Sequence, residues 1–76
     1  MTLVESILEA VARGCRVEIY SDQGVVFVEA RKRTVDEVNV CSRGVGPYEL
    51  ASSKLGPDFV LAHAVQSTSS ALGLKP

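Results

Sequence analysis

The stretch Cys15-Arg-Val-Glu-Ile-Tyr-Ser-Asp-Gln-Gly-Val-Val-Phe-Val-Glu-Ala30 decides the fold. Apolar and polar residues alternate on both sides of a polar centre, which is the pattern of a half-buried antiparallel hairpin. With Ser21 opposite Gly24 and the turn at Asp22 and Gln23, it predicts strands 15–21 and 24–32. One face of this hairpin is then wholly apolar: Cys15, Val17, Ile19, Val26, Val28 and Ala30.

The other face of the hairpin is mixed. The register sets Arg16 opposite Glu29, which predicts an ion pair across the strands. A slip of one residue would exchange apolar and polar side chains between the faces, so the pattern specifies which side chains meet the core. The mixed face carries Arg16, Glu18, Tyr20, Val25, Phe27 and Glu29.

A third strand is predicted over 36–42. Setting Lys32 opposite Asp36 leaves Arg33-Thr-Val35 as the loop and makes the sheet a three-stranded antiparallel meander. Val38 and Val40 then join the apolar face, and Cys41 points outward.

A helix over 2–13 precedes the hairpin. Thr2 and Glu5 have the spacing of a capping box, in which each side chain bonds to the backbone N–H of the other residue. Gly14 is placed to end the helix with a left-handed residue. The apolar residues recur at helical spacing and predict the buried side: Leu3, Val4, Ile7, Leu8, Val11 and Ala12.

Two prolines mark helices after the sheet. Pro47 begins a short helix over 47–55; the alternative is a fourth edge strand over 48–51, which Glu, Ala and Ser disfavour. Pro57 begins a helix over 57–72, with Asp58 at its positive end. Its apolar stripe is Val60, Leu61, Ala64, Val65, Thr68, Ala71 and Leu72.

These elements predict an α+β fold. The sheet has one apolar face and the two longer helices are amphipathic, so the economical solution is a two-layer sandwich with the helices on one face of the meander. The order is α-β-β-β-α, with the short helix inserted before the last one. The chain has 76 residues, which predicts a single domain over 1–76.

The order α-β-β-β-α resembles the double-stranded-RNA-binding domain in topology. That family begins its last helix with a basic Lys-Lys-x-Ala-Lys motif that contacts phosphates. The matching stretch here, Ser53-Lys-Leu-Gly-Pro-Asp58, contains a single lysine. The resemblance is therefore confined to the order of the elements and transfers no site residue.

Composition narrows the classes of function. The net charge of −1 offers no general excess of positive charge for nucleic acid. No apolar run is long enough to cross a membrane, and the acidic amino terminus is not a signal peptide. Cys15 and Cys41 match no zinc or redox spacing and, lying on opposite faces, are predicted to be free thiols. We expect a cytoplasmic protein without metal or cofactor.

Catalytic chemistry has no candidate in this sequence. His63, the single histidine, is predicted to point to solvent, and no carboxylate pair stands isolated in an apolar setting. Gly44-Val-Gly46 lacks the Gly-Lys-Ser/Thr ending of a phosphate loop. We therefore expect a protein that is not an enzyme.

Two groups of residues are candidates for binding. An apolar corner on the mixed sheet face, predicted to contact a partner protein or a second copy, comprises Tyr20, Val25, Phe27 and Cys41. A basic cluster for phosphate comprises Arg31, Lys32, Arg33 and Arg43. The first group predicts a small protein-interaction module, a regulator or inhibitor that acts as a homodimer. The second predicts an accessory protein that binds nucleic acid through the tip at 31–33.

Overall fold

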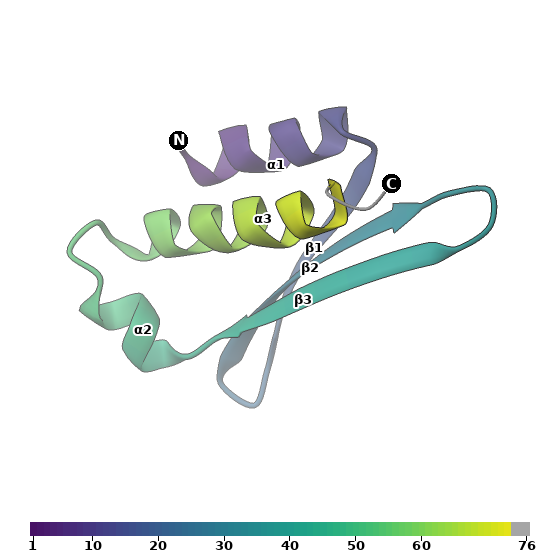
Figure 1. The fold of residues 1–76 in the computed structure, drawn as a ribbon. Helices are drawn as coiled ribbons and strands as arrows, with labels where there is room; N and C mark the ends of the chain where they lie inside the picture. Colours follow the sequence, from purple (N-terminus) through teal and green to yellow (C-terminus); the bar gives the residue numbers. More distant parts are fainter. Residues whose placement is uncertain (74–76) are drawn as a thin grey trace.

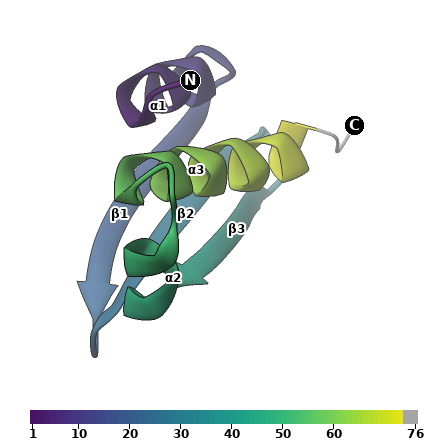
Figure 2. The ribbon, with the colours of Figure 1, turned by 90° about the vertical axis from the view of Figure 1, so that its left-hand side faces the viewer.

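The computed structural model describes residues 1–73 as a three-stranded antiparallel sheet with helices packed on it, which confirms the α+β class (Figure 1). The sheet order is β1-β2-β3, and α3 lies along β2 and β3 with α1 beside it over β1 (Figure 2). In chain order the elements are α1 (Leu3–Ala12), β1 (Cys15–Asp22), β2 (Val25–Arg33), β3 (Val38–Val45), α2 (Pro47–Ser52) and α3 (Pro57–Gly73).

The core lies between the sheet and α3. Apart from Leu72, its buried residues are small or β-branched. Leu3, Ile7, Val17, Cys41 and Leu50 pack around its edge. The fully buried centre consists of Val28, Ala30, Val45, Ala64 and Val65.

The first helix begins as the sequence predicts. The Glu5 backbone N–H donates to Thr2 Oγ1 at 3.1 Å, and the Thr2 N–H donates to Glu5 Oε1 at 2.9 Å. This reciprocal pair satisfies two backbone donors that a helix end leaves free. The N–H of Thr2 beside its carboxylate holds the pKa of Glu5 below its ordinary value.

The buried side of α1 differs from the prediction. Ser6, only 1% exposed, faces α3, and the Gln66 side-chain amide donates to its Oγ at 3.1 Å. Ser6 Oγ donates in turn to the Thr2 carbonyl at 2.9 Å, so this buried hydroxyl is satisfied. The contact turns Val4, Leu8 and Val11, predicted as core, toward solvent.

The turn between β1 and β2 lies at Gln23 and Gly24, one residue later than predicted. Both residues have positive φ, 51° and 80°, as a type I′ turn requires. Ser21 therefore pairs with Val26, and the register differs from the predicted one by two positions. Because side chains alternate with a period of two, the predicted core face of the hairpin is unchanged.

The loop between β2 and β3 has a larger effect. Thr34 closes it: its backbone N–H donates to the Glu37 carbonyl at 2.8 Å, and its Oγ1 accepts from the Glu37 N–H at 3.2 Å. Lys32 therefore pairs with Asn39, not with Asp36, a difference of three positions. An odd shift exchanges the faces of β3.

The predicted sides of β3 are therefore wrong. Cys41 pairs with Ala30 and packs against the core, whereas Val38 and Val40 point away from it, 49% and 48% exposed. After the sheet, the chain forms a helix over Pro47–Ser52 and not an edge strand. This helix ends before the predicted residue 55 because Ser53 has an extended backbone, with ψ of 126°.

The turn provides a test of the register. Gly24→Ala should lower the free energy of unfolding by about 1 kcal/mol, the cost of left-handed backbone for an L-residue with a Cβ. Backbone strain alone is responsible, because no atom lies within 4 Å of a Cβ built there. Gly24→Asn, which tolerates this conformation, should lose less, and Gln23→Asn should stabilise the turn. Urea unfolding measures all three; equal values for Gly24→Ala and Gly24→Asn would contradict the type I′ turn.

The lowered pKa of Glu5 provides a second test. The carboxylate is stabilised in the folded state, so its contribution is complete above the ordinary glutamate pKa of 4.5. It is lost as the pH falls through the lower pKa of the folded state. Glu5→Gln keeps the shape but not the charge, so it should be less stable than the natural chain at pH 7 and equal to it in acid. Thermal unfolding at a series of pH values measures this; a difference that persists in acid would contradict it.

Candidate functional site

The face of the sheet opposite the helices, here called the outer face, holds part of each group predicted to bind. No other described element covers it (Figure 2). Its side chains follow from the register of the three strands. They are Arg16, Glu18, Tyr20 and Asp22 of β1; Val25, Phe27, Glu29, Arg31 and Arg33 of β2; and Val38, Val40 and Ser42 of β3, with Gly44 in line.

Like residues lie opposite each other across β1 and β2. Arg16 pairs with Arg31, Glu18 with Glu29 and Tyr20 with Phe27. These pairs form successive bands across the outer face: an arginine band, a glutamate band and an aromatic band. The predicted ion pair between Arg16 and Glu29 is not formed, because the register differs by two positions.

The ion pairs run along the strands and not across them. Arg16 Nε lies 3.1 Å from Glu18 Oε1, and Arg31 Nη2 lies 3.2 Å from Glu29 Oε1. Each carboxylate therefore neutralises the arginine two residues away in its own strand. Both pairs are partly exposed, so each contributes only about 0–1 kcal/mol to stability.

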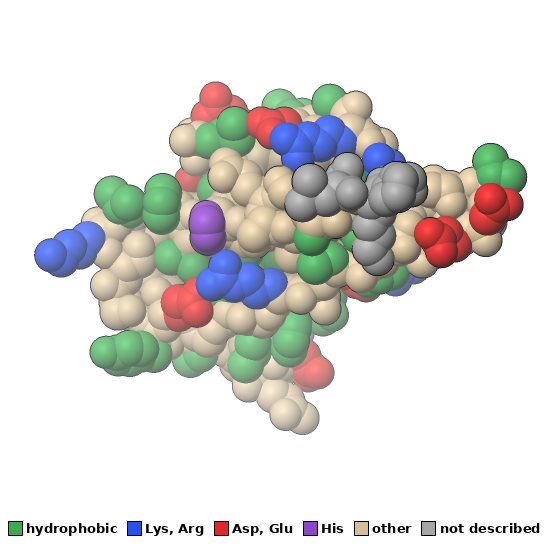
Figure 3. Space-filling model, in the orientation of Figure 1, with side chains coloured by type: hydrophobic (Ala, Val, Ile, Leu, Met, Phe, Trp, Pro, Cys, Tyr) green, Lys and Arg blue, Asp and Glu red, His purple; other side chains and the backbone are tan. Residues whose placement is uncertain are grey.

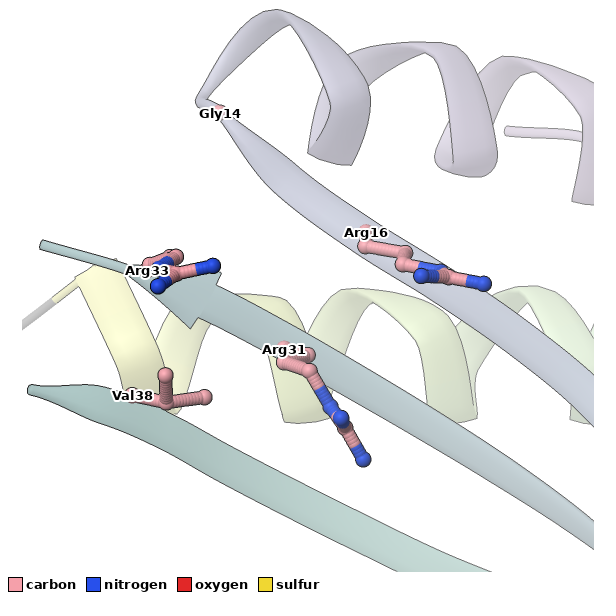
Figure 4. Close-up of a pocket in the computed structure, with 5 residues that line it drawn as sticks. All are labelled: Gly14, Arg16, Arg31, Arg33 and Val38. Carbon is pink, nitrogen blue, oxygen red and sulfur yellow. The ribbon is translucent and has the colours of Figure 1, made fainter.

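A hollow lies at the arginine end of the outer face (Figure 4). Its volume is about 260 Å³, and its lining joins the end of α1 to all three strands. Within residues 1–73, Arg33 has no carboxylate within ion-pairing distance. We call this hollow the arginine pocket; its lining is Gly14, Arg16, Arg31, Arg33 and Val38.

The aromatic band lies at the other end of the outer face. The rings of Tyr20 and Phe27 stack with centroids 5.4 Å apart and an interplanar angle of 20°. Phe27 also lies over Gly44, because a Cβ at that glycine would be 3.1 Å from Phe27 Cε1. The absence of a side chain at Gly44 therefore leaves room for the ring against β3. Val25 borders the same position.

The predicted apolar corner is thus partly assembled. Tyr20, Val25 and Phe27 share the outer face, but Cys41 lies on the other face beside the core. Gly44 takes the place beside Phe27 that the prediction gave to Cys41. An explicit preference for glycine in the second turn position would have corrected the first register, although not that of β3.

The predicted phosphate cluster is divided between two faces. Arg31 and Arg33 lie on the outer face, whereas Lys32 lies on the core face. Arg43 is also on the core face, where its Nη2 lies 3.0 Å from Glu49 Oε2 in α2. Arg16, which the sequence prediction did not include, replaces them in the arginine pocket.

No metal-binding group of side chains occurs among the described residues. His63 is exposed on α3, as predicted, and is the single purple side chain in Figure 3. Over residues 1–73, no three His, Cys, Asp or Glu side chains are grouped to hold a metal ion. Cys15 and Cys41 are free thiols, although both face the core and not opposite sides as predicted.

A second apolar surface lies on α1. Val4, Leu8 and Val11 follow one another at helical spacing and are 55–64% exposed. On the helix side, the other exposed apolar side chains are scattered around α2 and the start of α3 (Figure 3). The described part of the chain therefore has two uncovered surfaces, the outer face and the α1 stripe.

Comparison with known proteins does not assign the chain to a family. No family model, curated protein or solved structure matches it. Of the helices in residues 1–73, none is both long and apolar enough to cross a membrane.

The packing of Phe27 on Gly44 is testable. Gly44→Ala should lower the free energy of unfolding by about 1 kcal/mol, because its Cβ would press on the Phe27 ring. The loss should be smaller in a Phe27→Leu background, where the ring is absent. Urea unfolding of the two single variants and the double variant completes the cycle. Equal losses in both backgrounds would show that the ring does not cause the effect.

Proposed function

We propose that the protein is a small, non-enzymatic interaction module that binds a partner protein through its outer face, as a regulator or inhibitor of that partner. The observation that carries this proposal is the aromatic band on an open sheet face. Tyr20 is 46% exposed there, and Val38 and Val40 of β3 add exposed apolar surface at the arginine end of the same face. Aromatic residues and arginine, which the outer face combines, are enriched at protein interfaces.

Sheet geometry supports the same proposal. The outer face is a continuous surface of three paired strands, so the backbone that carries its side chains is ordered before any partner arrives. A preorganised backbone loses little conformational entropy on binding. The α1 stripe adds a second apolar surface of the kind that marks interaction sites. Two free thiols suit a reducing compartment, and we place the protein in the cytoplasm without metal or cofactor.

The arginine pocket favours a second candidate, binding of nucleic acid. Three arginines on one face offer charge for phosphates, and Tyr20 could stack on a base. The glutamate band argues against it, because Glu18 and Glu29 stand between the arginines and the aromatic rings. A nucleic acid strand crossing from one band to the other would pass over both carboxylates. We therefore rank protein binding first.

The partner can be sought with the immobilised full chain in an extract of the cells that produce it. Tyr20→Asp and Val40→Asp should reduce retention of the partner roughly tenfold or more, as expected for central interface positions. His63→Asp, exposed on the helix side, is the matched control and should retain it. Leu8→Asp tests the α1 stripe separately. Mass spectrometry identifies the retained protein, and a nucleic acid stain detects retained nucleic acid.

Two results would contradict the proposal. One is a partner held equally well by the natural chain and by both variants of the outer face. The other is retention of nucleic acid that Arg33→Gln abolishes, which would establish the second candidate. Circular dichroism of each variant shows whether the fold is retained.

A further inference from the structure

The order of the bands on the outer face creates contacts that a single chain cannot make by itself. Along the strands the order is Arg33 in the pocket, then the arginine band, the glutamate band and the aromatic band. Successive levels are two residues apart, about 6.6–6.8 Å. Directly opposed like charges destabilise a sheet, and this face has two such pairs. A partner with the reverse order would match these four levels, and the level of Asp22 and Val25 beyond the aromatic band would lie outside the match.

We propose that this partner is a second copy of the chain, packed outer face to outer face with its strands antiparallel. The two-fold axis lies between the sheets, perpendicular to the strands, midway between the arginine and glutamate bands. The inference rests on the proposed function, since it assigns the same outer face to a second copy when the partner protein is absent. A two-fold interface brings the same patch of both copies together and requires that patch to be self-complementary.

The charged bands match under this operation. Each strand lies over its own copy in the reverse direction, so the arginine band of one chain meets the glutamate band of the other. Arg16 then faces the partner's Glu18, and Arg31 faces the partner's Glu29. Each carboxylate keeps the arginine of its own strand and gains a second one. Each guanidinium has five N–H donors, so it can serve both carboxylates.

The two levels that flank the charged bands, the aromatic band and the arginine pocket, match in shape as well as in charge. The aromatic band of one copy lies over the arginine pocket of the other. Gly14, which has no side chain, faces the partner's Tyr20, and Arg33 faces the partner's Phe27. The pocket's volume of about 260 Å³ gives the two rings a place to enter. An arginine over an aromatic face is a favourable cation–π contact.

The other face-to-face symmetry is excluded by charge. With the two-fold axis along the strands, β1 of one copy would lie over β3 of the other, and on the central strand Arg31 would face the partner's Arg31 and Glu29 the partner's Glu29. Like-charge contacts across an interface cost several kcal/mol. The order of the bands therefore selects the antiparallel dimer.

The size of the sheet limits the affinity. Three strands of eight or nine residues present a projected area of roughly 400 Å². Standard interfaces bury about 800 Å² per partner. The dimer is therefore expected to be weak, and it must be measured at protein concentrations up to about 1 mM.

Charge reversal provides the test, with the mass in solution measured by analytical ultracentrifugation. The acidic variant carries Arg16→Glu and Arg31→Glu, and the basic variant carries Glu18→Arg and Glu29→Arg. Each variant alone should dimerise at least roughly tenfold more weakly than the natural chain, because like charges then face each other. An equimolar mixture should form a heterodimer. Added salt should weaken it.

A matched control separates this from general attraction between oppositely charged proteins. Arg43→Glu with Lys54→Glu makes the same change in net charge away from the outer face. Mixed with the basic variant, this control should give no heterodimer. If either charge-reversed variant fails to fold, Arg31→Glu with Glu29→Arg in one chain is the alternative. This exchange keeps both an ion pair within the strand and the match across the axis, so it should dimerise like the natural chain.

Three results would overturn the inference: a natural chain that is monomeric at every concentration, folded acidic and basic variants that do not associate when mixed, or a control that associates equally well. These outcomes leave the proposed function standing if Tyr20→Asp still abolishes capture of another protein. If Tyr20→Asp affects neither capture nor dimerisation, the proposed function fails as well.

Discussion

Two consecutive residues with positive φ, Gln23 and Gly24, set the register on which the outer face depends. Moving a two-residue turn by one position changes every cross-strand partner by two, because both strands of the hairpin move. The core is unaffected by such a change, since each side chain stays on its own face. The outer face is affected, because the predicted pair of Arg16 with Glu29 is replaced by Arg16 with Arg31 and Glu18 with Glu29. The turn, rather than the core, determines the surface pattern.

The third strand shows what alternation can and cannot predict. Its apolar residues occupy both alternating sets, with Val38 and Val40 in one and Cys41 and Val45 in the other. The pattern therefore allows either face to be buried. Closure of the loop by Thr34 selects the second set, and Val45 becomes fully buried. The existence and order of the strands could be predicted, but the face of β3 depended on hydrogen bonds in a loop.

The first helix was predicted well along its length and poorly around its axis. Its cap involves only Thr2 and Glu5, so it can be predicted from their spacing in the sequence. Its buried side depends on α3, because close packing of two helices selects small residues such as Ser6 and Ala10 at the contact. A pattern that scores hydrophobicity ranks Leu8 above Ser6 and so chooses the wrong side. The hydroxyl of Ser6 is tolerated because Thr2 and Gln66 satisfy it.

The same reasoning explains why net charge says little about this surface. Each arginine of the central bands is balanced by a glutamate two residues away in its own strand, so the bands are nearly neutral together. Such a surface exerts little long-range attraction on a polyanion, and screening by salt weakens it further. At contact distance, however, the order of the bands distinguishes one orientation of a partner from its reverse. Complementary charge of this kind contributes specificity more than affinity. In the proposed complexes, the order of the charged bands would therefore select the orientation of the partner, and the aromatic band would add apolar contact.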